Sequence, residues 1–279
     1  MKKFISFLSP AKLNLGLKIV GKRNDGFHLL KTIFCLIDLF DEINIQVTNN
    51  GKISLIEHNQ AWNFWNDLSY KAAITLKKFT NCNLGCNIKI KKTIPSGAGL
   101  GGGSSNAATI LIALNQLWQT NLPIETLYSL GKTLGADVPF FIHGRNALAS
   151  GIGDEFEDIN LTEQYFILIK PNFHISTHLL FNNLQLEPKT STAKIDYNYL
   201  LQSKENDLLA TACKLQPKLL NILNDLKNYG TPTMTGSGSV LYLSYPDLST
   251  AKNIAKELYS RYNPYLVKSM DFSPMYIRS

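Results

Sequence analysis

A glycine-rich stretch at residues 97–103 is the part of the sequence best suited to chemistry. It holds five glycines in seven positions and runs into an apolar segment. Without Cβ atoms, this backbone can take positive φ angles and point several N–H groups inward. The helix that follows contributes unpaired N–H groups and the positive end of its dipole. The stretch is therefore predicted to cradle phosphate groups.

The predicted cradle extends slightly beyond the glycines on both sides. Two serines at its end carry hydroxyls suited to a phosphate or a magnesium ion. The full set is Pro95, Ser96, Gly97, Ala98, Gly99, Leu100, Gly101, Gly102, Gly103, Ser104 and Ser105.

A linker or a different nucleotide-binding motif fits the glycines less well. A flexible linker would join polar, unpatterned flanks, whereas an alternating strand precedes this stretch and an apolar helix follows it. Residues 97–102 formally match a dinucleotide-binding fingerprint, with Glu125 near the position of a ribose-binding acid. That fingerprint should follow a buried parallel strand, but residues 87–92 alternate and carry three lysines. The lysine of a P-loop is absent, as are the His-Arg-Asp and Asp-Phe-Gly motifs of protein kinases.

Two polar residues, Lys12 and Asn14, share one face of a predicted strand at residues 11–19. The opposite face is apolar and consists of Leu13, Leu15, Leu17 and Ile19. A strand that buries this apolar face presents Lys12 and Asn14 side by side. Both a catalytic lysine and a solvent-exposed lysine fit this pattern.

A second candidate, Asp137, lies between a predicted helix and Pro139, whose ring fixes the local backbone. Its carboxylate suits proton abstraction from a hydroxyl group. An aspartate that only closes a turn is the other interpretation.

The remaining chain predicts mixed strands and helices without a regular βαβ rhythm, which indicates an α+β fold. Strands are expected at residues 43–47, 88–91, 140–142, 147–149, 166–169, 240–243 and 266–270. Helices are expected at residues 68–79, 105–118 and 124–134, shortly after Pro171, as one long helix within 208–226, and at 248–262. An acidic, turn-rich segment at residues 154–163 suggests two lobes, residues 1–153 and 154–279.

Composition narrows the class of protein. The formal net charge of +7 fits an anionic partner. Because the lysines are scattered, the charge does not indicate whether that partner is a nucleic acid, a membrane or a phosphorylated small molecule. No apolar run approaches the ~20 residues of a membrane helix. The N-terminal apolar stretch is interrupted at Ser6 and lacks a cleavage site, and the four cysteines show no metal-site spacing. We expect a cytoplasmic protein with reduced cysteines.

Three motifs in one order resemble the GHMP kinase family of galactokinase, homoserine kinase, mevalonate kinase and phosphomevalonate kinase. They are residues 9–17 with 23–28, residues 95–105, and residues 234–239. Residues 135–141 add a fourth match. The similarity is greatest to the member that acts on an alcohol carrying a cytidine diphosphate, and it spans Ser9 to Pro274.

This resemblance implies a two-lobed fold and a reaction. The N-terminal lobe would be similar to domain 2 of ribosomal protein S5 and the C-terminal lobe would be ferredoxin-like. ATP, expected to arrive with Mg²⁺, would phosphorylate a small-molecule alcohol that carries a cytidine diphosphate. The protein would be a monomer or a weak homodimer and would bind neither nucleic acid nor membrane. Other hypotheses are a GHMP kinase for homoserine or mevalonate, a nicotinamide-dependent oxidoreductase, and a basic nucleic-acid-binding module.

The resemblance also implies residue roles. Asp137 would be the catalytic base, and Lys12 would keep it ionised and offset charge on the transferring group. Adenine would contact Asp67, Leu68 and Lys92. No metal ligand is assigned. The substrate would contact Asn14, Phe27, His28, Phe181, Thr235, Gly236, Ser237 and Gly238.

Three residues depart from the family pattern. Phe27 stands where tyrosine is commoner, and its ring still permits stacking on a base but offers no hydroxyl. Asp67 replaces the usual asparagine, and Ala98 replaces a glycine of the loop.

Overall fold

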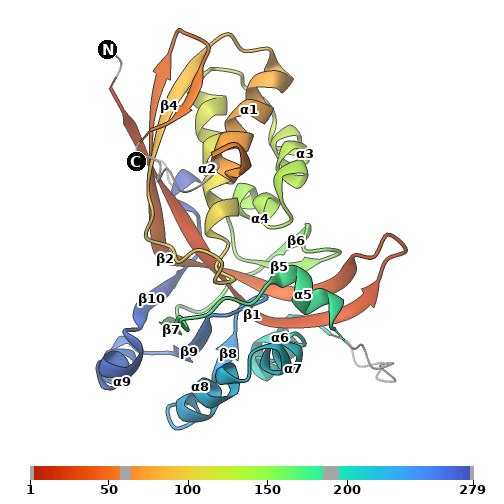
Figure 1. Cartoon of the computed structure of the whole chain (residues 1–279), viewed down its shortest axis with the longest axis vertical. Helices are drawn as coiled ribbons and strands as arrows, with labels where there is room; N and C mark the ends of the chain where they lie inside the picture. Colours follow the sequence, from red (N-terminus) through yellow and green to blue (C-terminus); the bar gives the residue numbers. More distant parts are fainter. Residues whose placement is uncertain (1–2, 57–63, 185–194, 277–279) are drawn as a thin grey trace.

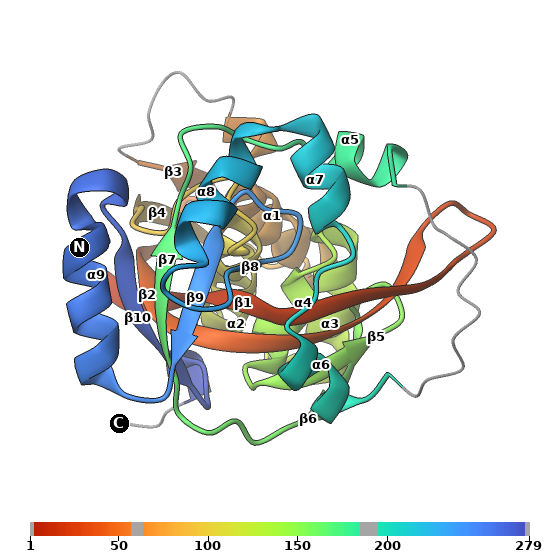
Figure 2. The same cartoon turned by 90° about the horizontal axis from the view of Figure 1, so that it is seen from below.

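The first two strands form a long antiparallel hairpin that organises the molecule. The computed structural model describes residues 3–56, 64–184 and 195–276. Strand β1 (Ile5–Lys22) pairs with β2 (His28–Thr48) along nearly its whole length, and register shifts interrupt the ladder at three places. The hairpin crosses the molecule and its tip extends beyond the rest of the chain (Figures 1 and 2).

Strand β2 is the hub of one continuous sheet, because it pairs with strands from both halves of the chain. The path along the sheet is β3-β4-β2-β10-β7-β9-β8, with β1 and β5 also on β2 and β6 on β5. The remaining strands are β3 (Ile53–Leu55), β4 (Gly85–Lys91), β5 (Ala147–Ser150), β6 (Glu155–Asp158), β7 (Tyr165–Ile169), β8 (Thr233–Met234), β9 (Leu241–Tyr245) and β10 (Tyr265–Met270).

The helices form two groups on the sheet (Figure 1). The first group covers the part built by the first half of the chain: η1 (Phe64–Asn66), α1 (Leu68–Thr80), α2 (Gly102–Leu117), α3 (Ile124–Leu134) and α4 (Val138–His143). The second group belongs to the second half: α5 (Thr177–Asn182), α6 (Tyr197–Ser203), α7 (Leu209–Leu215), α8 (Lys218–Leu226) and α9 (Leu248–Tyr262). The short helix η2 (Pro274–Tyr276) follows in the chain but packs on the first group, where the Tyr276 hydroxyl donates to the carbonyl of Ile142. Among the described residues, no helix has the length and apolar character needed to cross a membrane.

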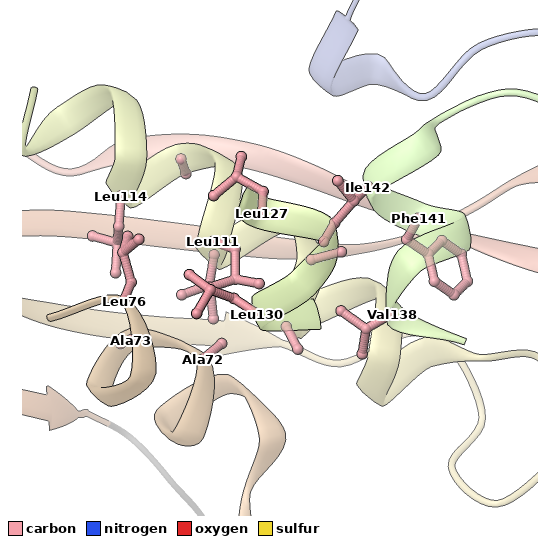
Figure 3. Close-up of a cluster of buried hydrophobic side chains, with 14 of the residues drawn as sticks. Ala72, Ala73, Leu76, Leu111, Leu114, Leu127, Leu130, Val138, Phe141 and Ile142 are labelled. Carbon is pink, nitrogen blue, oxygen red and sulfur yellow. The ribbon is translucent and has the colours of Figure 1, made fainter. Parts of the chain in front are cut away.

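The first helix group shares a core with strands β2 and β4. Helix α2 lies at its centre, and its Leu111 and Leu114 face Leu76 of α1 and Leu127 of α3 (Figure 3). Helix α2 is buried on most of its surface, which matches its strongly apolar sequence. This packing fixes the helix N-terminus that follows the glycine stretch.

The two faces of β1 meet different neighbours. The leucine face is buried as predicted, and Leu13 and Leu15 pack with Phe166 of β7 and Tyr242 of β9. The opposite face is also buried, so Lys12 and Asn14 are not exposed to water in the way an ordinary alternating strand would expose them.

Most predicted elements are confirmed, and two predictions are wrong. Residues 140–142 belong to helix α4, because Pro139 in its first turn has a φ angle suited to a helix start. The single long helix expected within residues 208–226 is two helices, α7 and α8. They are separated at Pro217, which lacks the N–H of a helix interior and disfavours helical geometry in Gln216. The division into lobes at residue 153 stays a prediction; β6, directly after it, pairs with β5 of the first half.

We expect Leu111→Ala to lower the free energy of unfolding by about 2–5 kcal/mol, because it leaves a cavity in the core around α2. Urea denaturation followed by circular dichroism measures this loss. Leu220→Ala is the matched control, since Leu220 is largely exposed on α8, and it should change stability by less than about 0.5 kcal/mol. Equal losses for the two variants would contradict the central place of α2 in the core.

Candidate active site

A cleft of about 1070 Å³ lies where the glycine stretch, α1 and the second half of the chain meet. Residues 95–104 form one wall. The others come from the apolar side chains Leu55, Ile56, Leu68, Ile88 and Ile90, the polar side chains Asn66, Asp67, Ser69, Lys92, Asn106 and Asp137, and His174, Thr177, Ser237 and Gly238. A cavity that combines an apolar end with a glycine-rich polar end suits a nucleotide.

The glycine loop, residues 95–104, has the backbone geometry that its composition predicts. Gly97, Gly99 and Gly101 have φ angles of +64°, +76° and +71°. Helix α2 starts at the next residue without a side-chain cap, so its first N–H groups are available to a ligand. Ala98 keeps a negative φ and buries its methyl group, so the departure from glycine there is accommodated.

The glycine loop packs tightly against the third motif. A Cβ atom on Gly99 would lie 2.4 Å from the carbonyl oxygen of Thr235 and 3.2 Å from that of Gly238. A Cβ atom on Gly101 would lie 3.2 Å from Cγ of Lys12. The backbone N–H of Lys12 also donates to the carbonyl of Leu100 at 3.1 Å. The glycines are therefore required by close packing as well as by φ.

Asp41, a buried carboxylate, anchors the entrance to this loop. Its Oδ1 accepts hydrogen bonds from the backbone N–H groups of Thr93 (2.7 Å) and Ile94 (2.9 Å). Its Oδ2 pairs with Nζ of Lys92, which lies half-exposed on the cleft wall. The sequence does not point to Asp41, because nothing in the local pattern of β2 separates it from other acidic residues.

The apolar end of the cleft contains both predicted adenine contacts of α1, Asp67 and Leu68. The Asp67 carboxylate caps this helix by accepting from the N–H of Ser69 at 2.7 Å. Asn106 of α2 also lines the cleft, and its buried Oδ1 has no hydrogen-bond partner among the described residues. An unpaired buried acceptor is costly, so it favours a donor from a ligand.

Lys12 and Asp137 meet beside the glycine loop. Their Nζ and Oδ2 atoms are 3.7 Å apart, with Lys12 only 3% exposed and the Asp137 side chain 36% exposed to the cleft. Asp137 precedes α4 but makes no side-chain cap hydrogen bond with it. Nζ of Lys12 also donates to Oδ1 of Asn14 at 2.5 Å and lies 4.9 Å from the ring centroid of Phe34. Burial lowers the pKa of Lys12 from its ordinary 10.5, and Asp137 offsets part of that shift.

Asn14 connects Lys12 to the third motif. Its backbone N–H donates to Oγ1 of Thr235 at 3.0 Å, and its side-chain amide donates to Oγ1 of Thr32 at 2.9 Å. A Cβ atom on Gly236 would lie 3.5 Å from Nζ of Lys12. The two motifs thus fix the ammonium group from both sides.

The residues predicted to hold cytosine lie at the hairpin and on α5, outside the lining of the cleft. The rings of His28 and Phe181 are stacked, with centroids 5.2 Å apart and planes inclined by 29°. Burial and the nearby Lys22 lower the pKa of His28, which favours a neutral ring. The Phe27 side chain is 58% exposed and free to cover a ligand.

His174 and Thr177 are among the cleft residues that the sequence did not point to. His174 precedes α5 and Thr177 is its first residue, and no spacing marks either of them in the sequence. Among the described residues, no three His, Cys, Asp or Glu side chains gather as a metal site.

Comparison with known proteins identifies the family. Residues 67–145 match the GHMP kinases N terminal domain. The chain is 41% identical over 276 residues to a 4-diphosphocytidyl-2-C-methyl-D-erythritol kinase of Chromobacterium violaceum. The aligned region covers 98% of this chain and 97% of that relative. The chain belongs to the GHMP kinase family. A kinase of the same name from Neisseria meningitidis serogroup C is 40% identical to this GHMP kinase over 272 residues, covering 97% and 96% of the two chains.

Solved structures confirm the predicted GHMP fold. A crystal structure of 4-(cytidine 5'-diphospho)-2C-methyl-D-erythritol kinase superposes with a TM-score of 0.83 at 29% identity, over 95% of this chain and 99% of that one. A mevalonate kinase shares the fold with a TM-score of 0.69 at 17% identity, over 96% and 99%. The α+β class and two-lobed architecture expected from the motifs are therefore those of the family.

We expect Gly99→Ala to weaken binding of a non-hydrolysable ATP analogue by at least tenfold, because its Cβ would collide with the Thr235 carbonyl. Isothermal titration calorimetry measures the affinity. Gly153→Ala is the control: Gly153 also has a positive φ, +98°, but its Cβ would meet nothing closer than 3.9 Å. If both variants bind equally well, the close contact does not shape the nucleotide site.

A second prediction concerns the buried charge. A folded-state pKa of Lys12 below 10.5 means that the unfolded chain holds this proton more tightly, so the charge destabilises the fold at neutral pH. Lys12→Met should leave the melting temperature at pH 7 unchanged or higher, while turnover falls by orders of magnitude. The difference in melting temperature between Lys12→Met and the wild type should become smaller as the pH rises toward 10.5. A variant that melts well below the wild type at pH 7 would contradict this.

Proposed function

We propose that this GHMP kinase transfers the γ-phosphoryl group of ATP to the 2-hydroxyl of 4-diphosphocytidyl-2-C-methyl-D-erythritol. The product is the 2-phosphate, a step of the non-mevalonate route to isoprenoid precursors. The observation that carries the proposal is the Lys12–Asp137 pair beside the glycine loop, which brings a proton acceptor and a cation to the phosphate end of the cleft. The names of the relatives at 40–41% identity support the choice of substrate.

The chemistry requires alignment, charge stabilisation and a proton acceptor. The Asp137 carboxylate accepts the proton of the 2-hydroxyl as that oxygen bonds to the γ-phosphorus. The bond between the γ-phosphorus and the bridging oxygen breaks, and ADP leaves with the electron pair. Lys12 offsets the negative charge of the transferring group from a site with little water, where its charge has a larger effect.

The glycine loop binds the phosphates through its backbone. Its N–H groups and the N-terminus of α2 supply donors without the lysine of a P-loop. Asn106 offers an acceptor to the nucleoside, and Lys92 and Leu68 flank the same cavity. Asp41 holds the start of the loop in place through Thr93 and Ile94.

The residues of the cleft fit a magnesium ion that arrives with ATP. Mg²⁺ prefers oxygen ligands and is commonly held by substrate phosphates, water and one or two protein groups. The Ser104 hydroxyl and the Asp137 carboxylate both line the cleft and would be the protein oxygens that hold the ion. When bound, the ion would neutralise phosphate charge.

The cytidine end of the substrate is assigned to the stacked His28 and Phe181 rings, with Phe27 beside them. A flat apolar surface and a neutral imidazole suit the face and the polar edge of a base. We also propose that the enzyme is cytoplasmic, which is consistent with four free cysteines. We propose that it is a monomer or a weak homodimer.

We expect Asp137→Asn to reduce kcat by a factor of about 10³ or more while KM for the cytidyl substrate changes little, because the amide cannot accept the proton. A coupled assay of ADP release over a series of concentrations of the cytidyl substrate measures kcat and KM. Asp158→Asn changes a carboxylate of β6 that pairs with His143 and Arg145 outside the cleft, and it should leave turnover unchanged.

Two outcomes would count against the proposal. Near-normal turnover of the Asp137 variant would remove this residue from its role. A wild-type enzyme that releases ADP faster with homoserine or mevalonate than with the cytidyl substrate would assign the activity to another alcohol.

A further inference from the structure

One short segment, residues 173–181, contacts both the glycine loop and the base-binding rings. At its start, Nδ1 of His174 lies 2.9 Å from the carbonyl oxygen of Gly97. A Cβ atom on Gly97 would lie 2.9 Å from the same nitrogen, so the ring packs directly on the loop backbone. At its end, Phe181 stacks on His28.

The His174 hydrogen bond has a defined direction. A carbonyl oxygen only accepts, so Nδ1 of His174 is the donor and carries the proton. The contact therefore depends on a donor at that position and not only on the bulk of the ring.

The first part of the segment is held by the third motif. The hydroxyl of Ser239 donates to the carbonyl of Phe173 at 2.8 Å, and the hydroxyls of Thr177 and Ser237 lie 2.8 Å apart. Ile175, between them, is buried in the core of the second half. These contacts leave little freedom for His174 to move without the rest of the segment.

Helix α5 carries the segment into the base-binding site. Ser176 caps the helix at the N–H of Leu179, and Leu180 anchors it in the core of the second half. Because Leu180 is anchored, the neighbouring Phe181 is held where its ring stacks on that of His28. Ser176 and Phe181 are less than two helical turns apart, so a displacement at the start of the segment would reach this ring.

We infer that His174 is a positioning residue that ties the glycine loop to the base-binding rings, so that ATP and the cytidine-bearing substrate bind with positive cooperativity. A nucleotide that orders the glycine loop fixes the Gly97 carbonyl, and through His174 it fixes the start of α5. The second ligand then meets a Phe181 already in place, which lowers the cost of ordering it. By reciprocity the substrate strengthens nucleotide binding by the same factor. This inference rests on the proposed function.

The test measures cytidine diphosphate binding by isothermal titration calorimetry, with and without a saturating non-hydrolysable ATP analogue. In the wild type we expect the analogue to tighten cytidine diphosphate binding roughly fivefold, the lower end of the usual range for coupled sites. His174→Ala should bring this factor close to one, with the affinity for cytidine diphosphate alone nearly unchanged.

Two matched variants separate positioning from general damage. His174→Asn keeps a side-chain N–H near the position of Nδ1 and should restore most of the coupling. His178→Ala removes an exposed histidine of α5 that contacts Asn182, and it should keep the full coupling factor.

The outcomes distinguish this inference from the proposed function. Binding of both ligands without coupling in the wild type overturns the role of His174 and leaves the kinase assignment intact. Full coupling in His174→Ala also overturns the role of His174 and leaves the kinase assignment intact. Failure of the wild type to bind cytidine diphosphate overturns both.

Discussion

The candidate active site is organised around one buried ammonium group. Lys12 lies in the centre of a strand whose two faces are both covered, and removing its charge from water costs free energy. Asn14, Phe34 and Asp137 surround the ammonium group and recover part of that cost. Only Asp137 retains exposure to the cleft. The buried charge makes the core less stable there, but it places a cation at a fixed position beside the phosphate-binding loop.

Close approach of two backbones is the second constraint. The glycine loop and the third motif touch through carbonyl groups, with no room for a side chain at Gly99. Asn14 and Thr235 hold the same contact from the strand side. Because one motif comes from the first half of the chain and the other from the second, both halves contribute to the packing of the phosphate end of the site.

The sequence predicted the elements whose signals are local. Helices α2, α3 and α9 were placed within a few residues, because apolar spacing and clear ends mark them. The prediction of one helix across Pro217 failed because the apolar pattern continues on both sides of the break. The sequence favours a strand instead of helix α4, because its run of five apolar and aromatic residues, 138–142, carries no period that separates a helix from a strand.

The residues of the candidate site also divide into those with a local signal in the sequence and those without one. The glycine loop was visible from composition, and Lys12 and Asp137 came from the motifs that surround them. Asp41, Asn106 and His174 were missed because their importance arises from tertiary contacts: two backbone N–H groups, an unpaired amide oxygen and a loop carbonyl. A single sequence contains no trace of such contacts.

Strand β10, the last strand among the described residues, pairs with the second strand, β2. It joins β2 to β7, so residues from the second half of the chain complete the sheet of the first half. Until β10 is in place, the middle of β2 lacks this neighbour. Contacts between such distant segments slow folding, and an unpaired strand invites association with other chains. A protein cut short before β10 would therefore lose the bridge between its halves although every residue of the glycine loop had been made.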